Sequence, residues 1–231
     1  MISIIIPVLN EQKALPQTLT FILKQKYLPQ RLKEIIIVDG GSDDDSVIIA
    51  QEFSKILPIK IISAKQGRAS QMNTGAKISS APWLLFLHAD TQLPLDGLER
   101  LYQSTKKTGV LAVCFKQTFS GNHLGLKFIS WLHNLRFHQT KIIYGDQAMM
   151  VKRDTFIKVG GFPEQKTEDV LFSRKLLALC TPIMLNAHVV TDSRKFEQIG
   201  TWRTLLYVID IQFQLRLSNT VTHQKFFQNY R

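Results

Sequence analysis

The segment His88-Ala89-Asp90 places an imidazole and a carboxylate two residues apart, directly after an apolar run from Trp83 to Leu87. The run predicts a strand buried on both faces, so the pair follows the carboxyl end of that strand. In an open α/β sheet, ligands bind in a crevice outside these ends, and residues two apart share one side of an extended chain. His88 and Asp90 could therefore bind a cation together, although an isolated His-x-Asp more often marks a strand followed by a polar turn.

Polar side chains also follow two earlier predicted strands. The β-branched run 2–6 is followed by Asn10 and Glu11, and the run 34–38 is followed by Asp39. The carboxyl ends of parallel strands meet at one edge of a sheet. The sequence therefore indicates a polar site at that edge, built from separate segments.

Two other acidic groups have a structural explanation. Ser42 and Asp45 have the spacing of a capping box, which predicts a helix start there and leaves Asp39 unexplained. Glu168 and Asp169 begin a later predicted helix, where acidic side chains complement the helix dipole. From the residues alone, that explanation stays open beside a catalytic one.

Strands and helices alternate along the chain, which predicts an α/β fold with a mostly parallel central sheet flanked by helices. The expected strands are 2–6, 34–38, 59–63, 83–87, 110–115, a stretch ending at 151, and 183–190. Helices are expected between them, and a long one from about Trp202 to Leu217. We expect the 231 residues to form one domain.

A basic amphipathic helix is predicted after Phe119. Its apolar positions recur at helical spacing, and they are Leu124, Phe128, Trp131, Leu132 and Leu135. Basic and polar side chains lie between them, including Lys127 and Arg136. We expect the apolar stripe to pack against the sheet, and a membrane interface is the alternative.

The formal net charge is +11, and the excess is regional. No acidic residue lies between Glu99 and Asp146, whereas seven lysines and arginines do. Such a patch suits nucleic acid, an anionic membrane or a phosphorylated substrate, and it is also compatible with a solvated basic face. No reading helix, aromatic stacking motif or zinc knuckle supports nucleic acid.

The cysteines and the N-terminus indicate a cytoplasmic location. Cys114 and Cys180 lie in apolar surroundings without metal-ligand spacing, so we expect buried thiols in a reducing compartment. The segment from Met1 to Pro7 has no basic region and is too short for a signal peptide.

Four motifs together resemble a known enzyme family. They are Ile-Pro-Val-Leu-Asn-Glu at 6–11, Ile-Ile-Val-Asp-Gly-Gly-Ser-Asp-Asp at 36–44, His-Ala-Asp at 88–90, and Gly-Gly-Phe with Thr-Glu-Asp at 160–169. In this order, over residues 1 to about 175, they are similar to an inverting family 2 glycosyltransferase of the GT-A fold. Gly67 to Asn73 and Leu87 to Thr91 are most similar to small bacterial members.

The resemblance implies a nucleotide-diphosphate sugar donor, with UDP favoured, and a Mg²⁺ or Mn²⁺ ion on Asp90. His88 replaces the first carboxylate of the usual Asp-x-Asp, so whether it touches metal, sugar or neither is open. The residues implied in nucleotide binding are Pro7, Asn10, Glu11, Asp39, Gly67, Arg68, Asn73 and Ala89.

The resemblance also implies the residues of the transfer step. Asp169 would be the general base and Glu168 would steer the acceptor. The acceptor or diphosphate walls would be formed by Tyr144, Gly145, Asp146, Gln147, Arg194 and Trp202. Residues 1–115 would bind the donor and 116–231 the acceptor. Because the Gln-x-x-Arg-Trp of processive synthases is missing, transfer of a single sugar is favoured.

Two alternatives remain at this point. A sugar-phosphate nucleotidyltransferase would need a glycine-rich loop after the first strand, and the segment from Pro7 to Glu11 has no glycine. A basic module with a degenerate transferase fold could instead bind a membrane surface or nucleic acid, and no motif of the chain supports nucleic acid. The segment from Lys127 to Lys141 could place the protein on anionic lipid at the inner face of the membrane, near a lipid-linked acceptor.

Overall fold

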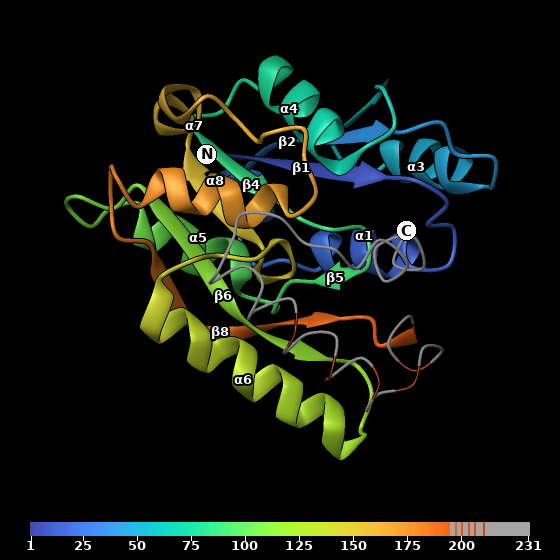
Figure 1. Ribbon diagram of the computed structural model, residues 1–231. Coiled ribbons are helices and arrows are strands. Elements are labelled where there is room, and N and C mark those ends of the chain that lie inside the picture. The colour runs from blue at the N-terminus through green and yellow to red at the C-terminus, as the bar shows by residue number, and fades with distance from the viewer. Residues whose placement is uncertain (195–196, 198–199, 201–202, 204–205, 207–209, 211–231) are drawn as a thin grey trace.

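One eight-stranded sheet runs through the protein, in the order β3-β2-β1-β4-β7-β6-β8-β5. The computed structural model describes residues 1–194 together with 197, 200, 203, 206 and 210. The strands are β1 (Ile2–Val8), β2 (Leu32–Asp39), β3 (Ile59–Ser63), β4 (Trp83–Phe86), β5 (Thr91–Gln92), β6 (Ala112–Phe119), β7 (Met149–Lys152) and β8 (Ile183–Thr191). The helices are α1 (Leu15–Leu23), α2 (Leu28–Arg31), α3 (Ser46–Ser54), α4 (Arg68–Ile78), α5 (Gly97–Ser104), α6 (Leu124–Thr140), α7 (Arg153–Val159), α8 (Glu168–Leu176) and the 3₁₀ turn Gly145–Gln147. Figure 1 shows this arrangement.

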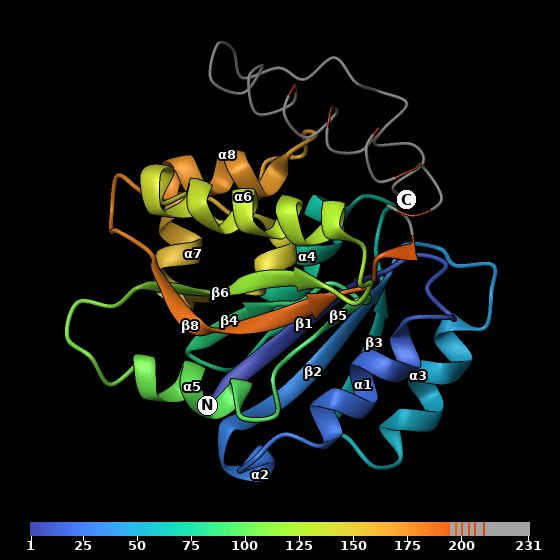
Figure 2. The same ribbon diagram turned by 90° about the horizontal axis from the view of Figure 1, so that it is seen from below.

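Helices cover both faces of the sheet, as the alternation predicts. Figure 2 shows α1, α2, α3 and α5 on one side and α4, α6, α7 and α8 on the other. Strand β1 is buried along its whole length, and its alternate residues enter two separate cores. Ile4 and Ile6 belong to the core under α1, whereas Ile5 belongs to the core under α4.

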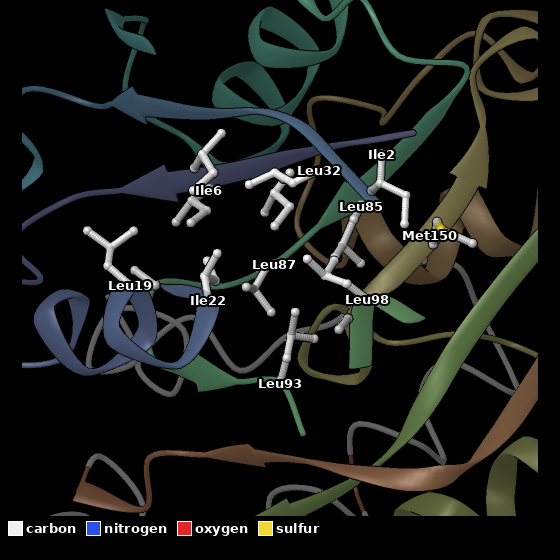
Figure 3. Packing of buried hydrophobic residues seen from close by; sticks show 14 of the residues in the cluster. Ile2, Ile6, Leu19, Ile22, Leu32, Leu85, Leu87, Leu93, Leu98 and Met150 are labelled. Carbon is white, nitrogen blue, oxygen red and sulfur yellow. The ribbon is translucent and has the colours of Figure 1, made fainter. Parts of the chain in front are cut away.

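The first core explains why the N-terminal strands read as continuous apolar runs. Figure 3 shows Ile6, Leu19, Ile22 and Leu87 packed between the sheet and α1. Burial of such side chains stabilises the fold by roughly 1.5–3 kcal/mol each. It also fixes the carboxyl ends of β1, β2 and β4 at one edge.

The other half of the sheet is mixed. Of the seven strand pairings, four are parallel, which confirms the predicted α/β class. Strand β7 lies between β4 and β6 and runs antiparallel to both, a direction that alternation along the chain did not indicate. Strand β5 has only two residues and was not predicted; it pairs with the end of β8.

Helix α6 forms where the sequence predicts it, but the expected packing face is wrong. The buried side chains include Leu126, Ile129 and Phe137, whereas the predicted stripe containing Leu124 and Trp131 faces outward. The helix has apolar residues on two sides, and the side nearer Phe119 of β6 is the one that packs.

Trp202 and the predicted helix 202–217 lie largely outside the described residues. Among the residues that the structure does describe, no helix has the length and apolar character needed to cross a membrane. Cys114 is buried as expected, Cys180 is partly exposed, and both are free thiols.

Candidate active site

Three of the segments that contain predicted site residues meet around His88. A Cβ atom added to Gly145 would lie 2.6 Å from Nε2 of His88 and 3.5 Å from Oδ2 of Asp169. The His88 ring therefore packs against the backbone of residue 145, beside the Asp169 carboxylate. This brings the segment after β4, the turn before β7 and the start of α8 into one site.

Asp169 is held by two backbone donors. The Gly145 N–H donates to Oδ2 at 2.7 Å, and the Val170 N–H donates to Oδ1 at 2.8 Å. Asp169 lies in the first turn of α8. Both oxygens have a fixed direction, which a residue that must receive a proton at one defined place requires.

Glu168 connects the two predicted halves of the site. Its carboxylate is buried and forms an ion pair with Arg68, with 2.8 Å between Oε1 and Nε. Arg68 begins α4, next to Gly67, which has a φ of +135°. The pair therefore fixes the start of α4 against the start of α8.

Asp39 has a structural role that the sequence did not reveal. Its carboxylate accepts hydrogen bonds from the N–H of Gly41, the N–H of Ser42 and the hydroxyl of Ser42. The predicted capping box is wrong, because α3 begins at Ser46 and the Ser42 hydroxyl is used by Asp39 instead. Asp39 thus shapes the turn after β2.

The loop after β1 is joined to this turn. The Asp43 N–H donates to Oδ1 of Asn10 at 3.0 Å, and the Asn10 N–H donates to the Ser42 hydroxyl. A cavity of about 370 Å³ lies here, with both acidic and basic walls. It is lined by Asn10, Glu11, Gln12, Lys13, Asp43, Asp44 and Arg194.

Arg194 follows the end of β8 and lines the same cavity as Asn10 and Glu11. It forms an ion pair with Asp192, whose N–H donates to the carbonyl of Asp90 at 3.0 Å. Pro7 is buried in β1, beyond the last residue that pairs with β4. The Ala89 carbonyl accepts a hydrogen bond from Thr18 of α1.

Gln71 is a residue whose role sequence reasoning missed. Its buried amide donates to the carbonyls of Val8 and Val38, each at 2.8 Å, and so ties the ends of β1 and β2 together. Asn73, predicted near the nucleotide, exchanges two hydrogen bonds with the backbone of Phe162. The only sequence signal for these roles was the motif from Gly67 to Asn73.

The segment from Tyr144 to Gln147 is held in place by buried side chains. Gln147 is buried, and its Oε1 accepts the Tyr144 N–H at 3.0 Å, so this side chain supports the wall from behind. The buried guanidinium of Arg136 lies 3.5 Å from the centre of the Tyr144 ring. Asp146 lies behind Tyr144, with its Oδ1 3.3 Å from Nε2 of His133.

Comparison with known proteins identifies the family of this chain. The model of a protein family described as glycosyl transferase family 2 matches residues 3–163, which is more than half of the chain. The chain belongs to glycosyl transferase family 2. It is therefore an enzyme that transfers a sugar from a nucleotide sugar. This membership disfavours the nucleotidyltransferase and the simple binding module.

This family 2 glycosyltransferase spans different fractions of the length of its relatives. It is 37% identical over 112 residues to the glycosyltransferase AglE of Haloferax volcanii, covering 47% of this chain and 36% of that protein. It is 28% identical to a PGL/p-HBAD biosynthesis glycosyltransferase of Mycobacterium tuberculosis, covering 98% of this chain and 82% of the relative.

Solved structures share the fold. The mannosyltransferase PcManGT of Pyrobaculum calidifontis, in complex with GDP-Man and Mn²⁺, has a TM-score of 0.73 at 20% identity, covering 98% of this chain and 66% of that one. TarS 1-349 of S. aureus in complex with UDP has a TM-score of 0.68 at 17% identity, covering 90% and 64%. The GT-A fold expected from the motifs is confirmed.

The side chains available for metal binding in this glycosyltransferase suit a cation that takes few protein ligands. In the described part of the chain, no group of three or more His, Cys, Asp or Glu side chains is arranged to hold a metal. Mg²⁺ and Mn²⁺ commonly use one or two carboxylates and complete their shell with phosphate oxygens and water. Asp90 with a bound diphosphate suits that mode.

Asp146 is the most perturbed acid of the site. Its burial and the nearby Asp169 carboxylate raise its pKa to about 7, against an opposing effect of Arg136. Burial lowers the pKa of His133 well below 6.5, so this partner is neutral at pH 7. The pair therefore carries little charge in the folded protein at slightly acidic pH.

We expect Asp146→Asn to flatten the dependence of stability on pH. The folded carboxyl keeps its proton up to about pH 7, whereas the unfolded one loses it near pH 3.8. Unfolding therefore releases a proton between these values, and the free energy of unfolding falls as pH rises. Between pH 5 and pH 8, the free energy of unfolding measured by urea denaturation should fall by roughly 2–3 kcal/mol less in the variant than in the wild type.

The matched control for this measurement is Asp154→Asn, because the Asp154 side chain is 84% exposed. Its pH profile should follow that of the wild type. Parallel profiles for Asp146→Asn and the wild type would contradict the proton held at Asp146.

Proposed function

We propose that this enzyme is a metal-dependent, inverting glycosyltransferase that moves one sugar from a nucleotide-diphosphate sugar to an acceptor hydroxyl. UDP is the favoured nucleotide. The observation that carries the proposal is the Asp169 carboxylate, fixed by the Gly145 N–H at 2.7 Å and placed beside His88. This carboxylate lies between residues expected to bind the sugar donor and residues expected to bind the acceptor.

Asp169 acts as the general base. In an inverting displacement, the acceptor hydroxyl attacks the sugar from the face opposite the leaving diphosphate and must lose its proton. The carboxylate of Asp169 receives that proton as the new glycosidic bond forms. Glu168, held by Arg68, steers the acceptor from the same helix turn.

Asp90 holds the cation, and His88 is its candidate second ligand. When bound, Mg²⁺ or Mn²⁺ neutralises the charge that develops on the departing diphosphate. Arg194, positioned by Asp192, adds positive charge at the same side. Inclusion of Mn²⁺ in the structure of PcManGT supports this cofactor class.

The donor half comprises residues 1–115 and the acceptor half residues 116–231. The nucleotide occupies the cavity formed by the linked loops after β1 and β2, where Asn10, Glu11 and the turn shaped by Asp39 lie. UDP and GDP-Man in the solved neighbours support a nucleotide-diphosphate sugar. The acceptor is a lipid, a small molecule or a protein.

Calorimetric titration with UDP-, GDP- and dTDP-sugars, each with and without Mn²⁺, tests this proposal. We expect one nucleotide class to bind, with affinity increased at least about tenfold by Mn²⁺. ADP-ribose serves as the control diphosphate. Equal, metal-independent heats for all ligands, or none with any nucleotide sugar, would contradict the proposed function.

A further inference from the structure

The outer face of α6 carries a continuous apolar stripe that no part of the described chain covers. Leu124, Phe128, Trp131 and Leu135 are 77%, 46%, 56% and 39% exposed. They recur every three or four residues and therefore form one line along the helix. The rings of Phe128 and Trp131 stack with their centres 5.7 Å apart. Figure 1 shows α6 along the edge of the molecule, next to β6 and β8.

A basic groove of about 410 Å³ runs beside this stripe, between α6 and the edge of β6 and β8. Two lysines, Lys116 and Lys127, line it together with His138 and His188, and burial and the nearby Lys116 lower the pKa of His188. Trp131 and Leu135 form part of both the stripe and the groove. Apolar and basic surfaces are thus contiguous.

Two buried polar side chains line the same groove and lack a hydrogen-bond partner in the described part of the chain. They are the amide of Gln117 and the hydroxyl of Ser130, which are 0% and 6% exposed as residues. A buried polar group without a partner costs about 1–3 kcal/mol. The Gln117 Nε2 and the Ser130 hydroxyl are donors to an anionic oxygen that reaches them, whereas the Gln117 Oε1, which also lacks a partner, would need a donor.

The charge of this surface indicates which class of partner it binds. The segment between Glu99 and Asp146 contains α6 and has no acidic residue. A helix with bulky apolar and aromatic residues on one face and lysine beside them is typical of helices that lie in a membrane interface. A protein partner would more often meet such a line of side chains with a matching groove and mixed charge.

We propose that the outer face of α6 docks this enzyme on an anionic bilayer surface. Leu124, Phe128, Trp131 and Leu135 enter the interface, and lipid phosphates lie in the basic groove. The inner face of the same helix carries Arg136, which packs on Tyr144 of the candidate acceptor wall. Docking would therefore hold the transfer site close to the membrane, which suits a lipid-linked acceptor; this consequence rests on the proposed function, whereas docking itself does not.

Co-sedimentation with vesicles tests the docking. The full chain should bind vesicles of phosphatidylcholine with 30% phosphatidylglycerol at least about tenfold more tightly than phosphatidylcholine alone. The double variant Phe128→Ser/Trp131→Ser should bind anionic vesicles at least about tenfold more weakly. Lys127→Glu should weaken binding by roughly tenfold, and 0.5 M salt should do the same to the wild type.

Ile157→Ser is the matched control, because Ile157 is an equally exposed apolar residue on α7, at 64%. It should bind vesicles like the wild type. Circular dichroism and nucleotide-sugar titration of each variant separate loss of docking from loss of fold or of donor binding. Failure of donor binding alone would count against the proposed function and leave the docking result intact.

Three outcomes would overturn the proposal. They are equal binding to neutral and anionic vesicles, wild-type binding by the double variant, and a wild-type dimer in sedimentation equilibrium that the double variant abolishes. The last result would assign the stripe to a second copy of the chain.

Discussion

Asp169→Asn should lower the rate of sugar transfer by roughly 10²–10⁴-fold, which is the usual contribution of a positioned general base. Asparagine has nearly the same shape, and its carbonyl oxygen can still accept the Gly145 N–H. It cannot receive the proton of the acceptor hydroxyl. The loss should therefore fall on kcat, while the affinity for the nucleotide sugar stays within about threefold of the wild type.

Steady-state transfer and calorimetry with the same donor check this prediction. The free energy of unfolding should fall by about 1–3 kcal/mol at most, because the asparagine oxygen keeps one of the two backbone hydrogen bonds and its NH2 group cannot accept the other. Asp154→Asn, an exposed acid-to-amide change on α7, should transfer sugar normally. Transfer by Asp169→Asn at a rate near that of the wild type would remove Asp169 from the role of base.

Asp90→Ala should lower transfer on the order of 10³-fold, because a bound cation contributes several kcal/mol of charge stabilisation. The backbone here is held independently of the side chain, since the Asp90 carbonyl accepts the Asp192 N–H at 3.0 Å. The fold should therefore survive the substitution. A readout specific to the cation is the gain in donor affinity on adding Mn²⁺, which the variant should lose.

Asp154→Asn again serves as the control and should keep the Mn²⁺-dependent gain. His88→Ala extends the test to the neighbouring imidazole: loss of the same gain would place His88 on the cation. If Asp90→Ala retains both transfer and its response to Mn²⁺, the metal assignment fails.

The parallel half of the fold was predictable because its strands are buried on both faces. Runs such as 34–38 can have no other stable place than the interior of a sheet flanked by helices. The direction of β7 was not predictable, because its partners β4 and β6 are distant in sequence. The packing face of α6 was predicted wrongly because the helix has apolar residues on two sides. Leu126 and Ile129 are buried, whereas Trp131 on the other side is exposed.

The candidate site likewise contains residues that the sequence could indicate and residues that it could not. Asp90, Glu168 and Asp169 could be proposed as site residues because motifs at strand and helix ends contain them directly. Gln71 could not, because its role depends on two carbonyls of distant strands, at Val8 and Val38. Ser42 illustrates the opposite error, since local spacing suggested a helix cap while the nearby Asp39 took its hydroxyl.

A Cβ at residue 145 would lie 2.6 Å from Nε2 of His88, so any larger residue there would have to displace the His88 ring. A substitution of Gly145 would therefore also change the position of His88. The same crowding couples the turn Gly145–Gln147 to the segment after β4 that contains His88 and Asp90, so a shift in one would be transmitted to the other. Libraries that vary this turn should be screened for altered metal response as well as for altered acceptor choice.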